Sequence, residues 1–257
     1  MLVVKGLELA YGDKKIFDGF DLSVSDGEIV CVLGRSGCGK TSLLNCIAGA
    51  LPYGGSITGA EDGVAYIFQE PRLISGLTAA QNVKFAVSHA LKDRERENRL
   101  IDSAFEKLGL SGLQNAFPEE LSGGQAARVS LARAFCHPSD VLLMDEPFGS
   151  LDIAVRLSLT EYISALALQR PRTTLMVSHG IEECLDLARR QTLPHIARDK
   201  DRRKTWGEKR DARKGADNGR DQGRSVIGMT RHKNAEPRGS VFLCLRVTGN
   251  EQGRQVC

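Results

Sequence analysis

Short, largely apolar runs recur along the first part of the chain, at residues 29–33, 64–68, 141–144 and 173–177. Runs of this length that end at glycine or polar residues are typical of strands. Elsewhere, residues 78–117, 126–135 and 153–168 carry apolar side chains at helical spacing. This alternation of strands and helices predicts an α/β fold, with a mixed or parallel sheet flanked by helices.

The N-terminal segment follows a different pattern. Residues 2–7 and 16–24 read as strands, and Asp26-Gly27 is a two-residue turn typical of a hairpin into residues 28–33. These segments predict an antiparallel β subdomain. The helical segments, beginning near the candidate N-cap Thr78, predict a helical subdomain at about residues 72–135.

A glycine-rich segment directly follows the apolar run 29–33 and matches the pattern G-x-x-x-x-G-K-[ST] between a strand and a helix. Its glycines permit positive φ angles, so backbone N–H groups can surround a polyphosphate. Lys40 can place a positive charge on the β and γ phosphates, and Thr41 can offer a hydroxyl to Mg²⁺. The helix that follows directs its N-terminus at the same phosphates. The predicted phosphate-binding loop comprises Gly34, Arg35, Ser36, Gly37, Cys38, Gly39, Lys40, Thr41 and Ser42.

Other predicted strands end in side chains that suit a bound triphosphate. Asp145 and Glu146 end an apolar strand, where burying two carboxylates without a partner is costly. Beside a triphosphate, Asp145 can bind the magnesium shell and Glu146 can polarise the attacking water. Gln69 ends another strand, where its amide can reach a metal or a water. His179 ends the last, and ligand contacts gather at the carboxyl ends of parallel strands, which favours a γ-phosphate contact.

Two further features are weaker when taken alone. Leu121-Ser122-Gly123-Gly124-Gln125 precedes a predicted helix, and a serine hydroxyl with exposed N–H groups can bind an anion there or simply cap the helix. Tyr11 lies in the loop between the first two strands. Its ring can stack on a purine or pack as an ordinary surface residue.

In this order the motifs resemble those of the ATP-binding cassette ATPases, over residues 1 to about 188. The run at 121–125 is close to diagnostic of that family, whereas the phosphate loop is shared by many NTPases. The resemblance implies ATP hydrolysis with Mg²⁺ as cofactor. It also implies the following roles: adenine stacking by Tyr11; magnesium ligation by Thr41, Ser42 and Gln69 with Asp145; catalysis by Glu146 as general base with His179, Lys40 and Gln69; and contact of Ser122, Gly123, Gly124 and Gln125 with ATP on a partner cassette.

The resemblance also implies partners. Two cassettes of this family enclose two nucleotides head to tail, so a homodimer is expected. Residues 68–73 and 77–83 are most similar to cassettes of nitrate, sulfonate and taurine importers. The chain is thus expected to be the ATPase subunit of an importer, peripheral at the cytoplasmic face of the cell membrane. It would act through a separate integral membrane permease, and a solute-binding protein would be an indirect partner. The alternative is a soluble cassette ATPase that works on ribosomes or DNA, but the interval from Lys40 to Leu121 has room only for the helical subdomain, so nucleic acid is not expected.

Composition agrees with a soluble, cytoplasmic protein. The 257 residues are 41% hydrophobic, enough for one large α/β domain, and no segment approaches the ~18 to 20 apolar residues that span a bilayer. No stretch at the N-terminus has the features of a signal peptide. The seven cysteines form no C-x-x-C pair and are odd in number, which favours reduced thiols.

Charge divides the chain into a nucleotide-binding domain, residues 1–188, and a basic tail, residues 189–257. The tail holds 18 Lys and Arg against 8 Asp and Glu, whereas the preceding part holds 17 against 24. Three alternatives account for it: a reading-frame shift that leaves a disordered tail, a basic arm for acidic lipids or nucleic acid, or a small folded appendage with a strand near residues 240–247. A chain without the family's closing strands could also be a defective cassette.

Overall fold

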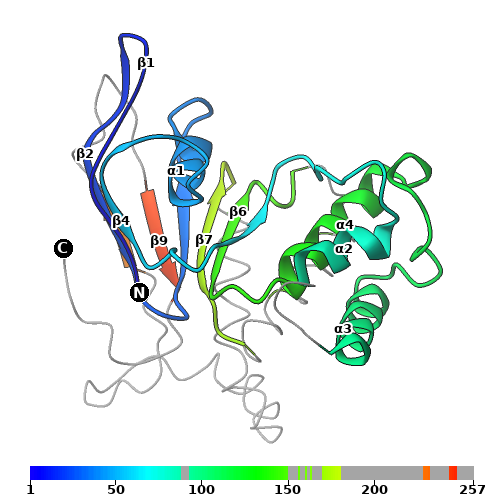
Figure 1. Ribbon diagram of the computed structural model, residues 1–257. Helices are drawn as coiled ribbons and strands as arrows, with labels where there is room; N and C mark the ends of the chain where they lie inside the picture. The colour runs from blue at the N-terminus through cyan, green and yellow to red at the C-terminus, as the bar shows by residue number, and fades with distance from the viewer. Residues whose placement is uncertain are drawn as a thin grey trace, which may run out of the picture.

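The protein is described by a computed structural model that covers residues 1–87, 93–149, 156, 160, 163, 170–180, 228–231 and 243–247. The described residues form two β-sheets and a lobe of helices beside them (Figure 1). The expected α/β class is confirmed. Most of the helix expected at residues 153–168 lies outside the described residues.

The smaller sheet is antiparallel, with strand order β2-β1-β4. It consists of β1 (Leu2–Tyr11), β2 (Lys14–Val24) and β4 (Gly54–Thr58). The tight turn between β1 and β2 contains Gly12, whose φ of 58° is a left-handed value that glycine adopts without a steric penalty.

The larger sheet has six strands in the order β5-β6-β7-β3-β9-β8. The first four are mutually parallel, whereas β9 is antiparallel to β3, and β8 is antiparallel to β9. The strands are β3 (Ile29–Leu33), β5 (Ala65–Ile67), β6 (Val141–Asp145), β7 (Thr173–Ser178), β8 (Gly228–Arg231) and β9 (Leu243–Val247).

The hairpin expected at Asp26-Gly27 is wrong in one respect. The chain does turn there, with Gly27 at φ 70°, but β3 then joins the larger sheet and pairs in parallel with β7 instead of returning along β2. Burial explains the difference. All five residues of β3 are buried, as in a strand covered on both faces, whereas β2 alternates between buried and exposed positions.

The parallel strands divide the core into two layers. Ile29, Cys31 and Leu33 point into one hydrophobic cluster together with the helical lobe. Val30 and Val32 point into the other, which includes the antiparallel sheet and α1 (Lys40–Ile47). Because successive side chains of a strand face opposite sides, one apolar run supports both layers.

The helical lobe contains α2 (Ala79–Val87), α3 (Arg94–Lys107), the short 3₁₀ helix η1 (Pro118–Glu120) and α4 (Gly123–Cys136). The predicted cap of α2 is confirmed, since Thr78 Oγ1 accepts a hydrogen bond from Gln81 N at 3.3 Å. Asp93 caps α3 by accepting from Glu95 N and Arg96 N. Each cap satisfies N–H groups that the helix itself leaves free.

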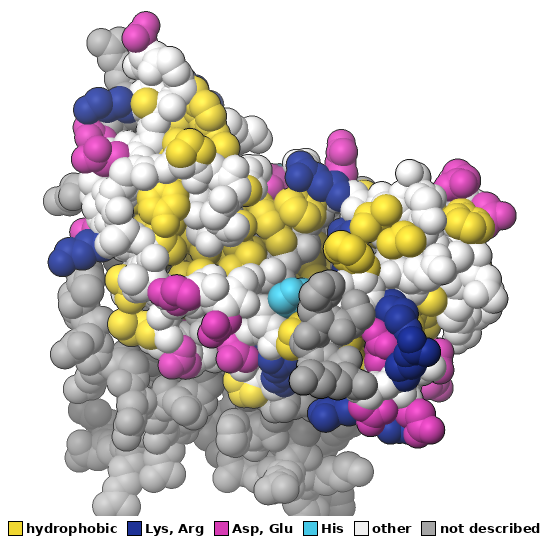
Figure 2. Space-filling view, viewed as in Figure 1, with side chains coloured by type: hydrophobic (Ala, Val, Ile, Leu, Met, Phe, Trp, Pro, Cys, Tyr) yellow, Lys and Arg dark blue, Asp and Glu magenta, His cyan; other side chains and the backbone are white. Residues whose placement is uncertain are grey.

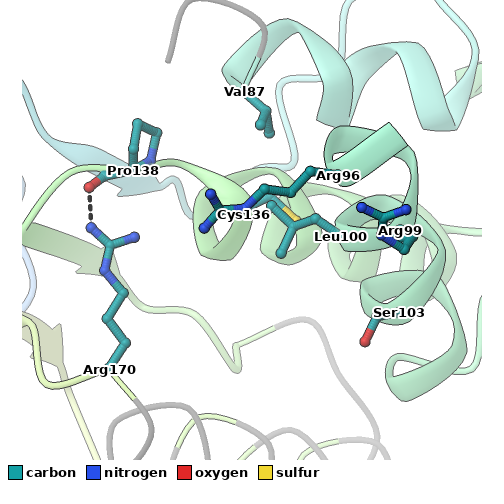
Figure 3. Close-up of a pocket in the computed structure, with 8 residues that line it drawn as sticks. All are labelled: Val87, Arg96, Arg99, Leu100, Ser103, Cys136, Pro138 and Arg170. Atoms are coloured by element: carbon teal, nitrogen blue, oxygen red, sulfur yellow. Dashed lines mark hydrogen bonds between the residues drawn. The ribbon is translucent and has the colours of Figure 1, made fainter. Parts of the chain in front are cut away.

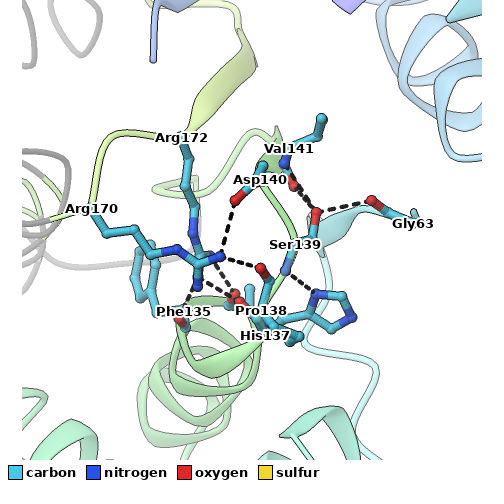
Figure 4. A network of polar contacts seen from close by, with 10 residues as sticks. Gly63, Phe135, His137, Pro138, Ser139, Asp140, Val141, Arg170 and Arg172 are labelled. Atoms are coloured by element: carbon cyan, nitrogen blue, oxygen red, sulfur yellow. Dashed lines mark hydrogen bonds and ion pairs between the residues drawn. The ribbon is translucent and has the colours of Figure 1, made fainter. Parts of the chain in front are cut away.

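Arginines tie the end of α4 to the larger sheet (Figure 4). Arg172, 8% exposed and immediately before β7, donates to the carbonyls of Ala134 (3.1 Å), Phe135 (3.0 Å) and His137. Arg170 donates to Pro138 O and pairs with Asp140. The carbonyls that Arg172 binds are at the negative end of α4, so its guanidinium group stabilises the helix and fixes α4 to the segment before β7.

The described parts of the basic tail are strands. β9 occupies the position beside β3, and its range falls within residues 240–247, where the folded-appendage alternative places a strand. The remaining tail residues lie outside the described part of the chain, so the domain boundary near residue 188 stays a prediction.

In the described part of the chain, no helix combines the length and the apolar character that crossing a membrane requires. Cys38, Cys46 and Cys136 are free thiols. Burial raises the pKa of the Cys136 thiol to about 12, which keeps it protonated and unreactive near neutral pH.

Candidate nucleotide-binding site

The glycine-rich loop between β3 and α1 has the shape of an anion cradle. Gly37 and Gly39 have φ angles of 74° and 105°, and a Cβ on Gly39 would lie 2.5 Å from Ile16 Cγ2. Gly39 is the N-cap of α1 and gives it no side-chain cap, so the first N–H groups of the helix stay available to a ligand. Glycine is therefore needed here both for backbone conformation and for space.

Lys40 is 6% exposed, and its Nζ donates to the carbonyl oxygens of Gly34 (2.8 Å) and Arg35 (3.2 Å). Among the described residues no carboxylate lies within ion-pair distance of this ammonium group. A buried positive charge held by neutral carbonyls favours an anion beside it. The loop is therefore closed around its own lysine.

Strand register brings the polar strand ends to one edge of the sheet. Leu33, which precedes the loop, pairs with Ser178, so His179 follows directly beside Gly34. Asp145 pairs with Val177, and Ile67 pairs with Met144, so Gln69 extends beyond the same edge as Glu146. The strand ends thus meet at one edge, as predicted, because the strands pair in this register.

Two hydrogen bonds join these groups. Thr41 Oγ1 donates to Asp145 Oδ1 at 3.2 Å, which links the phosphate-loop helix to β6. His179 Nδ1 lies 3.1 Å from Glu146 Oε2, and the His179 side chain is exposed whereas Glu146 is mostly covered. Glu146 has a φ of 45°, uncommon for a residue other than glycine, and its N–H donates to Val177 O. Glu146 thus remains bonded to β7 through its backbone while its carboxylate contacts His179.

The electrostatics of the edge suit a cation. Burial raises the pKa of Asp145, with a further increase from the charge of Glu146, while the Thr41 hydroxyl acts in the opposite direction. The charges of Lys40 and Arg72 also lower the pKa of Asp145, but it stays raised on balance, so this carboxyl is incompletely compensated. Thr41 and Asp145, with Gln69 nearby, therefore fit a divalent cation that also binds phosphate oxygens.

The remaining residues expected on the nucleotide side lie around this edge. Tyr11 is 51% exposed, and its hydroxyl lies 3.3 Å from Ser42 Oγ, so its ring stands next to the start of α1. Arg35, Ser36 and Gly37 are exposed in the loop. Cys38 is half-buried and packs against the core cluster around α1, as a small apolar side chain would.

The Ser122-Gly123-Gly124-Gln125 turn stands apart from this group. It starts α4 in the helical lobe, whereas α1 covers the sheet (Figure 1). Ser122 Oγ accepts from Gln125 N at 3.3 Å and Gln125 Oε1 accepts from Ser122 N at 2.8 Å, a reciprocal cap. Gly124 O accepts from Arg128 Nε. Among the described residues, the hydrogen bonds of this turn stay within the helical lobe.

The two glycines of this turn differ from those of the phosphate loop. A Cβ on Gly123 or Gly124 would meet nothing within 4 Å, and neither residue has a left-handed φ. Nothing in the described chain therefore requires glycine at these positions. Glycine permits a close approach of a ligand or another molecule from outside.

Sequence reasoning missed a set of contacts made by residues that flank Gln69 in the chain. The rings of Tyr66 and Phe68 stack with centroids 4.0 Å apart, and Arg72 Cζ lies 4.3 Å above the Phe68 ring. Arg133 on α4 donates to Pro71 O (3.0 Å) and Arg72 O (2.8 Å). Two aromatic residues at positions i and i+2 of a strand were the available signal, since they share one face.

A cavity of about 390 Å³ lies elsewhere, between α3 and the end of α4 (Figure 3). Its lining includes Arg96, Arg99 and Arg170. Two of these guanidinium groups are already paired, Arg99 with Glu95 and Arg170 with Asp140. None of the residues predicted to bind nucleotide lines it, so it is separate from the phosphate loop.

The fold and this edge define a protein of the phosphate-loop nucleotide-binding class. A family model described as "ABC transporter" matches residues 17–149. Among curated relatives, "Aliphatic sulfonates import ATP-binding protein SsuB 1" of Pseudomonas syringae pv. syringae (strain B728a) is 42% identical over 183 residues, which cover 70% of this chain and 75% of that protein. "Aliphatic sulfonates import ATP-binding protein SsuB" of Mycobacterium sp. (strain MCS) is 38% identical over 190 residues, covering 74% of this chain and 78% of that protein.

Solved structures agree. The "Dimeric Structure of MJ0796, a Bacterial ABC Transporter Cassette" is 26% identical, with a TM-score of 0.65 over 72% of this chain and 91% of that chain. A structure of the same cassette in a dimeric "post-hydrolysis state", "bound to ADP and Pi", has a TM-score of 0.66 at 24% identity, again over 72% and 91% of the two chains. The chain belongs to the ABC transporter family, as the sequence motifs predicted, and is an ATP-binding ABC ATPase.

Proposed function

We propose that this protein is the ATPase subunit of an importer for small organic anions of the sulfonate type. It hydrolyses ATP as a head-to-tail homodimer and drives a separate membrane permease. The observation that carries the proposal is the convergence of Lys40, Thr41, Asp145, Glu146 and His179 at one sheet edge. The names of the sulfonate-import relatives support the substrate class.

In the proposed mechanism the phosphate loop and Lys40 bind the β and γ phosphates. Thr41, Asp145 and Gln69, with Ser42 beside them, would hold Mg²⁺, which would neutralise phosphate charge. Glu146 orients the attacking water and accepts its proton. His179, adjacent to Glu146, contacts the γ phosphate.

The homodimer is supported by the separation of the two anion-binding turns. Ser122, Gly123, Gly124 and Gln125 are exposed or half-buried, and their hydrogen bonds remain within the helical lobe. In the proposed dimer they contact the nucleotide held by the other copy. A symmetric pair of chains then forms two composite sites, each with a phosphate loop from one copy and a serine-glycine turn from its partner.

Complementation tests this arrangement. A chain with Lys40→Ala and a chain with Ser122→Arg should each hydrolyse ATP poorly as a homodimer. A mixed dimer regains one intact composite site, because the unaltered phosphate loop of the second chain faces the unaltered turn of the first. Phosphate release should therefore rise when the two chains are mixed. If mixing restores nothing although heterodimers form, each site is built within one chain and the proposal fails.

The membrane partner is supported by an apolar face on the helical lobe. Figure 2 shows hydrophobic side chains over this lobe. The largest exposed ones around α2 are Phe85, Ile74 and Phe117, which are 60%, 40% and 39% exposed. An apolar face of this kind is typical of an interaction site. We assign it to a cytoplasmic loop of the permease, and we place the protein peripherally at the cytoplasmic face of the membrane.

Co-purification tests the partner. A membrane permease encoded beside this gene should be retained by the tagged wild-type protein in detergent. Phe85→Glu should abolish retention without loss of basal ATP hydrolysis, whereas Leu100→Glu on the neighbouring helix α3, where Leu100 is 38% exposed, should not. A protein that retains ribosomal or nucleic-acid partners instead would favour the soluble, non-transport alternative.

A further inference from the structure

The cavity between α3 and the end of α4 has both cationic and apolar walls (Figure 3). Arg96, Arg99 and Leu100 occupy positions i, i+3 and i+4 of α3, so they share the helix face that lines the cavity. Arg170, which lies shortly before β7, lines it from a distant part of the chain. The fold thus brings three guanidinium groups to one cavity of about 390 Å³.

The apolar part of the lining includes residues from three helices. Val87 is the last residue of α2, Cys136 is the last residue of α4, and both are buried. Leu100 on α3 is a large apolar side chain that is 38% exposed. The Cys136 thiol, with its pKa of about 12, adds no negative charge near neutral pH. This surface can therefore remove the apolar body of a ligand from water.

The three arginines differ in how far their charge is compensated. Arg99 pairs with Glu95 at 3.4 Å, and Arg170 pairs with Asp140 at 3.1 Å. Within the described residues, the guanidinium group of Arg96 has neither an ion pair nor a hydrogen bond, and no acidic side chain lines the cavity. One uncompensated guanidinium group beside an apolar surface suits a ligand with a single negative charge.

The end of α4 does not cancel this positive charge. Carbonyl groups at the C-terminal end of a helix are negative, but three of those near the end of α4 are already bound by Arg172. Burial lowers the pKa of His137, and the charges of Arg172 and Arg170 lower it further. The cations here therefore already oppose the arrival of another proton, as a region of excess positive charge does.

We propose that this cavity binds a small amphipathic anion, with a carboxylate, sulfate or sulfonate head at Arg96 and an apolar body against Leu100 and Val87. A ligand that binds the folded chain in this way stabilises it. The inference does not depend on the proposed function, because none of the residues assigned to ATP or to the permease lines the cavity.

Isothermal titration calorimetry of the full chain with hexane-1-sulfonate tests the site, with saturating ADP present to occupy the phosphate loop. The wild-type protein should bind one equivalent with a Kd of about 1 mM or tighter, as expected for a ligand of this size. Hexan-1-ol lacks the charge and methanesulfonate lacks the apolar body, so each should bind at least about tenfold more weakly.

Two arginine variants separate the site from general electrostatic attraction. Arg96→Gln should weaken the binding of hexane-1-sulfonate by about fivefold, because the head loses its charged donor. Arg94→Gln is the matched control and should change nothing, because Arg94 is exposed in the first turn of the same helix but does not line the cavity. Leu100→Glu removes apolar surface and adds a negative charge, so it should abolish binding.

Thermal unfolding gives a second readout. Without ligand, Arg96→Gln should unfold at the wild-type temperature, because the Arg96 side chain is exposed. Hexane-1-sulfonate should raise the unfolding temperature of the wild type more than that of Arg96→Gln. The inference is overturned if millimolar hexane-1-sulfonate gives the wild type neither binding heat nor a raised unfolding temperature, or if the two arginine variants bind it equally. Equal binding of hexan-1-ol and the sulfonate also overturns it, since the cavity would then have no preference for an anion.

Discussion

Replacing Glu146 by glutamine removes a charge while preserving shape, so it tests the proposed chemistry with little structural disturbance. The amide is close in size to the carboxyl, and the left-handed backbone at φ 45° and the Glu146 N to Val177 O hydrogen bond do not depend on the side chain. The His179 Nδ1 contact at 3.1 Å can be kept by the amide. The repulsion that Glu146 exerts on Asp145 disappears, so the pKa of Asp145 should fall and stability should not decrease.

The expected loss of turnover follows from the role of the carboxylate. Without a general base, ATP hydrolysis should slow by about 10²- to 10⁴-fold, which corresponds to roughly 3 to 5 kcal/mol in the activation barrier. Nucleotide binding should persist, and the dimer should accumulate with ATP bound. Because His179 contacts Glu146, adding His179→Gln should slow the reaction by less than the product of the two separate effects.

The assay is phosphate release at saturating ATP, together with nucleotide binding and thermal unfolding of each variant. Glu119→Gln in the exposed η1 segment serves as the control, since it removes the same charge from a position outside the sheet edge. Undiminished turnover of Glu146→Gln would show that the water is activated by another group. Loss of nucleotide binding would show that Glu146 acts before hydrolysis, in forming the site.

Three other predictions address the framework around the site. Gly39→Ala should destabilise the fold by about 2 kcal/mol or more, because Gly39 has a φ of 105° and an added Cβ would contact Ile16. Gly123→Ala should leave the unfolding temperature unchanged and lower only the ATPase rate of the dimer. Equal unfolding temperatures for the two variants would contradict this prediction. Arg172→Met should lower the unfolding free energy measured in urea by roughly 3 kcal/mol, because three carbonyls at the end of α4 lose their donor. Arg99→Met should lower it by less than about 0.5 kcal/mol, because Arg99 forms only an exposed ion pair. Similar losses for the two variants would refute the anchoring role of Arg172. Burial, with Arg172 and Arg170 nearby, lowers the pKa of His137 below its usual 6.5, and its Nδ1 accepts a hydrogen bond from Ser139 N. The unfolded state therefore binds the proton first, so the stability of the fold should decrease as the pH drops below about 6.5. His137→Asn should flatten this part of a profile of urea midpoint against pH, and an unaltered slope would count against the prediction.

The sequence was most informative where chemistry is local. Three predicted motifs are contiguous in the sequence, namely Gly34 to Ser42, Ser122 to Gln125 and the Asp145-Glu146 pair. In each motif, residue type and spacing alone indicate the predicted function. The sequence assigned Thr41 and Asp145 to one metal position, and the structure joins them by a hydrogen bond. The functional roles of these residues remain predictions, to be tested as described.

The sequence was least informative where partners are distant along the chain. The turn at Gly27 was visible, but the partner of β3 was not, because a tight turn is compatible with either sheet. The donors Arg133 and Arg172 resemble any helical or loop arginine until the carbonyls they bind are placed in space. The left-handed backbone of Arg72 has no sequence signal either, since arginine is not a residue that favours it.

The pairing of β3 with β9 has a consequence for how the chain reaches its native state. The first of these strands lies near the start of the sequence and the second near residue 245, so they meet only when an exceptionally long loop closes. Until then one side of a wholly apolar strand offers unsatisfied N–H and C=O groups to neighbouring molecules, which invites aggregation. Slow synthesis at low temperature and dilute refolding should therefore raise the yield of native protein.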